Sequence, residues 1–287
     1  MMSSLLLAAL VLTSPLFAAD IALPDDTRFL PLVAPLAADW VLPAGHGKDC
    51  KLLVDPKSEP WLGCRGRYLL GPAYGVFSLT ERHFDDIAWM GGLGLWAVSG
   101  AQLGRLDVAQ TLHGGRGADK TPFLPAADFG GGPLRLARAA RAGFYVYDRE
   151  RVFLMTPGKA GWTRTSLLKS RDPITAVAGD GVRTFFAVGR TVIARDARGK
   201  PAAVFTHPDA DITALEFAPE SGLFYATVHG VGFIGASYDF EFLRTPDAQI
   251  SLHGAVLYVK LVGDRGTLKL QGLEQFRELS RLLVRPD

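Results

Sequence analysis

Asparagine is absent from this sequence of 287 residues. An N-glycosylation acceptor site begins with Asn, so the chain offers no such site. Without Asn, the formation of tight turns depends on the 32 glycines, the 18 prolines and the aspartates, all of which favour turn conformations.

A strong excess of charge of either sign is also missing. The 31 Lys and Arg residues nearly balance the 29 Asp and Glu residues, which leaves a formal net charge of +2. Domains that bind nucleic acid usually carry a basic patch or stripe, and membrane-binding patches are polybasic. We therefore expect neither a nucleic-acid partner nor a polybasic membrane contact.

Long apolar runs are missing except close to the N-terminus. There an apolar run at residues 5–11 precedes a proline and two small residues, Ala18 and Ala19. This pattern is typical of a secretory signal peptide, and it is too short and interrupted to span about 30 Å of hydrocarbon. It predicts a signal peptide at 1–19, a mature chain at 20–287 that is periplasmic or secreted, and no transmembrane segment.

Cysteine is nearly absent, since only Cys50 and Cys64 occur. In an exported protein such a pair is usually oxidised, which predicts a disulfide. Closing a loop of about 15 residues in this way stabilises the fold by about 3 kcal/mol. The alternative is a metal site, which needs further ligands, and His46 is the only histidine near the pair.

The sequence does contain an internal repeat. Ile-Thr-Ala at residue 174 recurs at residue 212, and Ile-Ser-Leu follows at residue 250, so that both steps are 38 residues. Each start is followed, within about ten residues, by an aromatic and β-branched run that is typical of a strand. Further units begin at Ile87 and Leu134, and a first unit at 40–84 contains both cysteines.

A repeat of about 40 residues with four short strands is typical of one blade of a propeller. The sequence therefore predicts an all-β chain, a single β-propeller of about six four-stranded blades. A strand within 29–36 and a short helix at 272–284 are expected where the chain ends meet. The alternative is a β-sandwich, although a sandwich gives no reason for a regular step of 38 residues.

These units resemble WD-type, YVTN-type and quinoprotein-like propeller repeats. The segment at 189–200, Gly-Arg-Thr-Val-Ile-Ala-Arg-Asp-Ala-Arg-Gly-Lys, is similar to a blade segment of quinoprotein-like propellers. The resemblance covers residues 87–273 at the level of architecture, and the Trp-Asp dipeptide of WD repeats is absent.

Acidic residues precede most of the repeat starts. If each start is the innermost strand, the loop before it opens beside the central channel, and these loops contain Asp86, Asp172, Asp211 and Asp247. One interpretation is an acidic rim that binds a cation or a basic segment of a partner. The other is that each Asp caps its own turn.

A short basic stretch begins the third unit, with Arg135, Arg138 and Arg141. An Arg guanidinium binds carboxylate or phosphate as a fork, which would suit an anionic ligand. The acidic residues Asp148 and Glu150 in the same unit instead favour a solvated, mixed-charge face.

No catalytic motif is recognisable: the chain has no Gly-x-Ser-x-Gly elbow and no His-x-His pair. We therefore predict no catalytic residue, metal or cofactor. The predicted function is a binding or assembly module that presents a ring face to a protein or peptide partner in the cell envelope. The alternative is a metal- or quinone-dependent propeller enzyme, a lactonase-like hydrolase or an oxidoreductase, although lactonases of this fold usually use Asn ligands.

Overall fold

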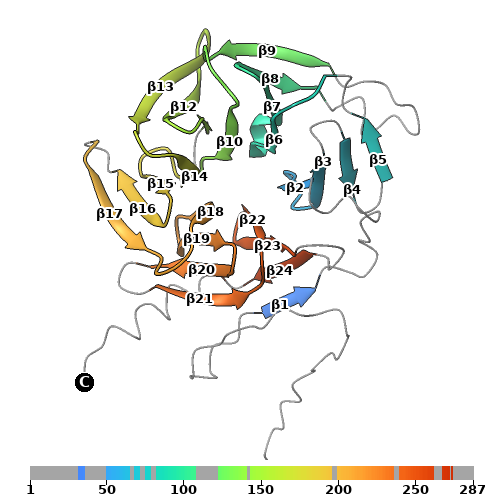
Figure 1. Ribbon diagram of the computed structural model, residues 1–287. Coiled ribbons are helices and arrows are strands. Elements are labelled where there is room, and N and C mark those ends of the chain that lie inside the picture. The colour runs from blue at the N-terminus through green and yellow to red at the C-terminus, as the bar shows by residue number, and fades with distance from the viewer. Residues whose placement is uncertain are drawn as a thin grey trace, which may run out of the picture.

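The computed structural model describes residues 32–35, 50–64, 68–71, 75–78, 82–107, 122–140, 143–195, 199–235, 239–261, 267–271 and 273. Its strands form six separate four-stranded sheets, which stand as blades around a central axis (Figure 1). The chain is therefore an all-β propeller, as predicted, and the β-sandwich is wrong because the strands divide into six sheets rather than two. The predicted signal peptide and C-terminal helix lie outside the described residues.

The blades are numbered in chain order, and the strands of each blade are given from the centre of the ring outward. Blade 1 contains β2 (Cys50–Val54), β3 (Pro60–Cys64), β4 (Tyr68–Gly71) and β5 (Gly75–Ser78). Blade 2 contains β6 (Asp86–Trp89), β7 (Leu95–Ser99), β8 (Gln102–Leu106) and β9 (Phe123–Asp128), with the 3₁₀ turn η1 (Gly91–Leu93) after β6. Blade 3 contains β10 (Arg135–Arg138), β11 (Phe144–Tyr147), β12 (Arg151–Gly158) and β13 (Gly161–Lys169).

The second half of the ring has the same design. Blade 4 contains β14 (Ile174–Gly179), β15 (Thr184–Val188), β16 (Thr191–Arg195) and β17 (Pro201–Thr206). Blade 5 contains β18 (Ile212–Ala218), β19 (Gly222–Thr227), β20 (Gly230–Ile234) and β21 (Asp239–Arg244). Blade 6 contains β22 (Gln249–His253), β23 (Val256–Lys260), β24 (Thr267–Gln271) and, as its outermost strand, β1 (Leu32–Pro35).

The ring closes through blade 6. β1, the first described strand, pairs antiparallel with β24, near the end of the described chain. The inner strand β22 contacts β2 of blade 1, as the other inner strands contact their neighbours. The strand expected within 29–36 is thus confirmed, and it joins the two ends of the chain in one sheet.

The 38-residue repeat reflects a shared irregularity of the inner strands. In β14 the register with β15 shifts between Ile174 and Ala176, so Thr175 is an extra residue, a β-bulge. β18 shows the same shift around Thr213. The hydroxyl of Thr175 lies 3.3 Å from the Ala187 carbonyl oxygen, and that of Thr213 lies 3.2 Å from the Ala226 carbonyl oxygen. Ile-Thr-Ala therefore recurs because each copy forms the same bulge.

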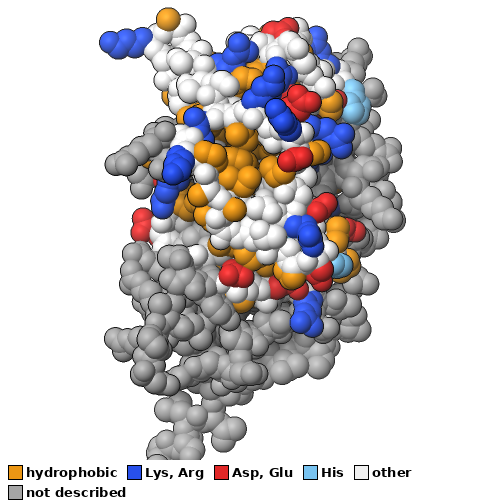
Figure 2. All heavy atoms as spheres, turned by 60° about the vertical axis from the view of Figure 1, so that its left-hand side comes forward, with side chains coloured by type: hydrophobic (Ala, Val, Ile, Leu, Met, Phe, Trp, Pro, Cys, Tyr) orange, Lys and Arg blue, Asp and Glu red, His pale blue; other side chains and the backbone are white. Residues whose placement is uncertain are grey.

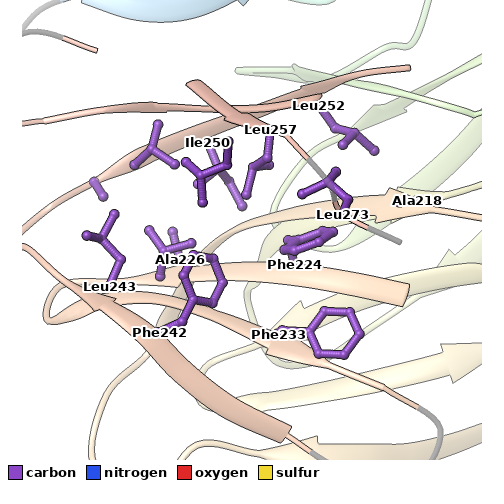
Figure 3. Close-up of a cluster of buried hydrophobic side chains, with 14 of the residues drawn as sticks. Ala218, Phe224, Ala226, Phe233, Phe242, Leu243, Ile250, Leu252, Leu257 and Leu273 are labelled. Carbon is purple, nitrogen blue, oxygen red and sulfur yellow. The ribbon is translucent and has the colours of Figure 1, made fainter. Parts of the chain in front are cut away.

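Each sheet buries its faces against the neighbouring blades, because a single sheet cannot cover its own apolar sides. Between blades 5 and 6, Phe224 and Phe233 are fully buried, with ring centroids 5.3 Å apart. Ile250 and Leu257 of blade 6 belong to the same apolar cluster (Figure 3). The aromatic runs of the repeat are therefore the contacts between blades.

The predicted disulfide is confirmed in blade 1. Cys50 begins β2 and Cys64 ends β3, the two are directly paired across the strands, and their sulfur atoms are bonded. Both are buried, and the alternative of a metal pair is wrong because the thiols are oxidised. Among the described residues, no helix has the length and apolar content needed to cross a bilayer.

Candidate functional site

The inner strands surround a cavity of about 520 Å³ on the axis of the ring. All six blades contribute to its lining, and the strands run through it in the same sense. Residues that begin the inner strands, such as Asp86 and Arg135, therefore lie towards one end, and residues that end them, such as Arg138, towards the other. We call the first end the mouth and the second end the floor.

At the mouth, Asp86 links three consecutive blades. Its carboxylate oxygens lie 2.8 and 2.9 Å from the Lys51 ammonium of blade 1. The same carboxylate accepts hydrogen bonds of 2.8 Å from its own neighbour Ile87 and from the backbone N–H of Leu136 in blade 3. Because these donors occupy the carboxylate, Asp86 holds the ring together and leaves little acceptor capacity for another cation.

Gln249 makes the corresponding link between blades 6 and 1. Its side-chain oxygen accepts a 2.8 Å hydrogen bond from the backbone N–H of Leu52, and its amide nitrogen donates one of 3.0 Å to the Cys50 carbonyl. The buried Lys260 also donates to the Cys50 carbonyl, at 3.0 Å, and burial lowers the pKa of its ammonium. These bonds tie the disulfide-bonded strand to the last blade.

At the floor, Arg138 crosses the cavity from blade 3 to blade 6, on the opposite side of the ring. Its guanidinium donates to the Leu252 carbonyl at 3.2 Å and lies 3.2 Å from Nδ1 of His253. Burial and the Arg138 charge lower the pKa of the His253 imidazole, so the ring is neutral near pH 7 and Nδ1 accepts the bond from the arginine.

Glu216 of β18 belongs to the same floor. Burial raises the pKa of its carboxyl to about 7, against the opposing effects of the Arg138 charge, the Leu252 N–H and the Lys51 charge. A smaller cavity of about 190 Å³ lies beyond, and Arg138, Glu216 and Leu252 line both cavities. These three residues therefore separate the central cavity from the opposite end, and the central cavity has the form of a cup.

One wall of the cup is formed by Arg135 and Tyr147, which face each other across β10 and β11. Burial raises the pKa of the Tyr147 phenol to about 12, the Asp86 charge adds to this, and the charge of the nearby Arg135 opposes it. The phenol is therefore protonated at neutral pH. Arg135 is exposed to the cup, and its Nη1 lies 3.4 Å from the Thr175 carbonyl oxygen.

The predicted acidic rim divides into two pairs. Asp86 and Asp247 line the cup, whereas Asp172 and Asp211 are exposed and do not line it. Turn capping of the kind considered for these residues occurs elsewhere, at Asp55, Asp148 and Asp180, which accept hydrogen bonds from backbone N–H groups two to four residues further along the chain. Neither pair forms a compact acidic cluster.

The sequence pattern gives too little weight to the basic residues that line the cup. Arg135 and Arg138 were assigned to a solvated face, yet both line the cup from the innermost strand of blade 3; Arg141 lies outside the described residues. Lys51, Tyr147 and Glu216 were not identified. The available signal was a charge inside a short apolar first strand, as in Cys-Lys-Leu-Leu-Val and Ile-Thr-Ala-Leu-Glu-Phe-Ala.

The outside of the ring offers a different surface. The outer strand β17 exposes Pro201, Ala202, Ala203 and Val204 in succession, and Val204 is 47% exposed. On this flank of the ring, apolar side chains gather between lysines and arginines (Figure 2). An uncharged edge strand can pair with another strand, but no described residue indicates what would cover this flank.

No set of three His, Cys, Asp or Glu side chains converges as metal ligands within the described parts of the chain. His207 is buried, and its Nδ1 accepts a 3.0 Å hydrogen bond from the backbone N–H of Ala210, which gives it a role in the turn before β18.

No known family model and no curated protein matches this sequence. Several solved structures are similar in shape. A luciferin-regenerating enzyme has a TM-score of 0.58 at 13% identity, over 85% of this chain and 96% of that one. A putative gluconolactonase has 0.56 at 13% identity, over 83% and 97%. The extracellular domain of a putative one component system from B. thetaiotaomicron has 0.51 at 10% identity, over 83% and 39%. At these identities the likeness shows the propeller fold alone.

Proposed function

We propose that this chain is an exported binding module of the cell envelope, which receives a protein or peptide partner at the mouth of its cup. The observation that carries the proposal is the cup itself: a cavity with charged side chains from blades 1–3, closed at its far end by Arg138. Charged and polar lining residues such as Asp86, Arg138 and Gln249 are held by bonds between blades, which makes this part of the surface rigid. A preformed cavity with a few placed polar groups is the usual form of a binding site.

Three further observations support export. The chain has a buried disulfide, and such bonds persist mainly in oxidising compartments. The apolar run at residues 5–11, followed by Ala18 and Ala19, has the form of a signal peptide. One of the structures similar in fold is an extracellular domain.

Export is tested by expressing the full chain in a Gram-negative host and measuring the intact mass of the protein in the periplasmic fraction. We expect a mature chain that begins at Ala19 or Asp20, with the Cys50–Cys64 bond formed. A chain that keeps Met1 and stays in the cytoplasm would contradict the proposal.

Binding at the mouth is tested with a photo-crosslinking amino acid placed at either end of β14. Arg171 precedes this strand and is exposed at the mouth end, and Val182 follows it and is 57% exposed at the floor end. We expect a discrete crosslinked product with an envelope component from position 171 and none from position 182. Equal crosslinking from both positions would show that the mouth is not the binding face.

The acidic residues at the mouth have a defined part in this proposal. Asp247 lines the cup, and Asp172 and Asp211 are exposed at the same end of their blades. We propose that they contact basic groups of the partner around the opening, because ionised carboxylates attract such groups and speed their encounter. Asp86 contributes less, since Lys51 already neutralises it.

The second candidate function is catalysis in the same cup. Glu216 favours it, because a carboxyl with a pKa of about 7 inside a cavity is a feature of general acid–base sites. The test is hydrolysis of a panel of lactones and aryl esters by the purified chain. Turnover that is lost in Glu216→Gln would establish this function, and absence of turnover across the panel would exclude hydrolysis of these substrate classes.

A further inference from the structure

We infer that the cup recognises a carboxylate group, and that Arg135 and Tyr147 are the residues that bind it. The inference rests on the proposed function and specifies which chemical group of the partner enters the cavity. It follows from the hydrogen-bonding capacity of the wall of blade 3 and from the position of this wall inside a closed-ended cavity.

Arg135 has unused donor capacity. A guanidinium carries five N–H donors, and within the described parts of the chain Arg135 makes one hydrogen bond, a long one of 3.4 Å to the Thr175 carbonyl. Within the described parts of the chain, no carboxylate lies within 4 Å of this guanidinium, in contrast to Lys51, whose ammonium lies 2.8 Å from Asp86. The charge of Arg135 therefore faces the cup without a counterion from the described chain.

Asp86 does not serve as that counterion. It lies close enough to Tyr147 for its charge to affect the phenol, but its two oxygens already accept hydrogen bonds from Lys51, Ile87 and Leu136. A carboxylate with this many donors is satisfied, so an anion that enters the cup competes with no strong intramolecular partner for the fork of Arg135.

Tyr147 supplies a further donor at the same place. Tyr147 lines the cup and its phenol stays protonated, so its O–H group is a donor for an acceptor in the cup. The side chain is 7% exposed, and its pairing with Arg135 across β10 and β11 fixes the relative position of the two groups. A planar guanidinium fork with a neighbouring O–H donor matches the two oxygens of a carboxylate.

The size and depth of the cup limit what carries the carboxylate. A cavity of about 520 Å³ accommodates a small organic acid or an amino-acid side chain. The floor presents a second guanidinium, Arg138, beside Glu216. A ligand that reaches the floor therefore meets a second guanidinium there, and while Glu216 is protonated the floor also favours an acidic group over a basic one.

The experiment uses two matched pairs of probes in isothermal titration at constant ionic strength and pH 6, where Glu216 keeps its proton and the acid probes are largely ionised. The first pair is glutarate and its neutral analogue glutaramide, and the second is acetyl-Gly-Glu-Gly-amide and acetyl-Gly-Gln-Gly-amide. We expect the acid of each pair to bind with a dissociation constant in the millimolar range or tighter, roughly tenfold or more below that of its amide. Equal binding of acid and amide in both pairs would overturn the inference, as would tighter binding of inorganic phosphate than of either acid.

Variants assign the binding to the proposed wall. We expect Arg135→Gln to weaken binding of the acids by about tenfold or more, because it removes the fork and its charge. Arg135→Lys keeps the charge and should restore part of the affinity, and Tyr147→Phe should weaken binding by about three- to tenfold. Arg149→Gln removes a positive charge from an exposed position after β11, at the same end of the ring and outside the cup, and should leave affinity unchanged. Equal weakening by Arg149→Gln and Arg135→Gln would overturn the assignment.

The outcomes separate this inference from the function on which it rests. Binding of the Glu peptide supports a protein or peptide as the source of the carboxylate. Binding of glutarate without the peptide supports a carboxylate site for a free small acid, and it contradicts the protein partner. Crosslinking at position 171 without binding of either acid keeps the proposed function and refutes the carboxylate site.

Discussion

The two halves of the ring line the same channel with different side chains. The inner strands of blades 1–3 contribute four charged residues, Lys51, Asp86, Arg135 and Arg138. The inner strands of blades 4–6 contribute one carboxyl, Glu216, together with Gln249, His253 and apolar and hydroxyl residues. Both halves have the same four-stranded blades and the same antiparallel order, so the difference lies in side chains and not in the fold.

The difference separates the construction of the ring from its chemistry. In the regular half, blades 4–6, Ile-Thr-Ala and its β-bulge recur at a step of 38 residues in blades 4 and 5, and Ile-Ser-Leu follows at the same step in blade 6. The irregular half, blades 1–3, departs from that pattern at the positions where charged side chains face the channel. Local departures from the rules of a fold are expected at functional positions, and blades 1–3 are where we place the binding site.

The largest expected effect tests the role of the regular half as scaffold. Phe224→Ala removes a fully buried ring between blades 5 and 6 and should lower the free energy of unfolding by about 3–5 kcal/mol. Denaturant unfolding measures it, with Phe224→Leu as the milder control. Glutarate binding should persist wherever the variant remains folded. Loss of binding by the folded variant would show that the two halves are not separable.

The next effect tests what holds the irregular half. Replacing both cysteines, Cys50→Ala with Cys64→Ala, should cost about 3 kcal/mol, because the disulfide closes a short loop of the unfolded chain. Chemical denaturation of the oxidised wild type, the reduced wild type and the double variant measures it. The reduced wild type should behave like the double variant. Equal stability of all three would mean that the hydrogen bonds of Gln249 and Lys260 suffice to hold β2.

How far the sequence predicts this structure also differs between the halves. Identical starts at 174 and 212 recur at one spacing and predict the blade length and the inner strands of the regular half. The count of about six also needs the less regular starts at 87 and 134 and the first unit at 40–84. The disulfide followed from the number of cysteines. The closing strand β1 was expected because a ring must join its ends.

The site was predicted only in part. The Asp residues before the inner strands were found because they precede a recognisable start, and of these Asp86 and Asp247 reach the cup. For Arg135 and Arg138 the alternating charge nearby favours a solvated face over an anion site, because the sequence places them at the start of a blade but does not show that their side chains face the channel. That Arg138 spans the ring to Leu252 depends on a contact between residues 114 apart in sequence, which no local pattern encodes.

A smaller effect concerns Glu216, the one carboxyl that the inner strands of blades 4–6 contribute to the channel. The pKa of Glu216 is about 7 in the folded chain against 4.5 as its ordinary value. Between these values the folded state keeps a proton that the unfolded state has lost, so the contribution of Glu216 to stability decreases as pH rises from about 4.5 to above 7. Glu216→Gln removes this dependence. The free energy of unfolding of the variant, relative to that of the wild type, should therefore rise by on the order of 1–3 kcal/mol between pH 4 and pH 8.

Urea unfolding at a series of pH values measures this difference, with Glu220→Gln as the matched substitution of an exposed carboxyl. A difference between wild type and Glu216→Gln that does not change with pH would mean that the floor leaves the ionisation of Glu216 unperturbed. Blade 5 would then carry an ionised Glu216 into the channel, and blades 4–6 would not form a neutral half.

The smallest effect separates two residues that occupy the same position of the repeat. The Thr175 hydroxyl lies 2.7 Å from the Ile212 carbonyl oxygen of the next blade, closer than the Ala187 carbonyl of its own blade. The Thr213 hydroxyl has only the contact within its own blade among those found.

Substitution by Val keeps the shape of either side chain. Thr175→Val should therefore cost about 1 kcal/mol, and Thr213→Val, at an exposed position, about 0.5 kcal/mol or less. Thermal unfolding of the two variants in parallel measures it. Equal losses would show that the repeat stabilises each blade separately, and a larger loss for Thr175 would show that one copy of the motif also joins blades 4 and 5.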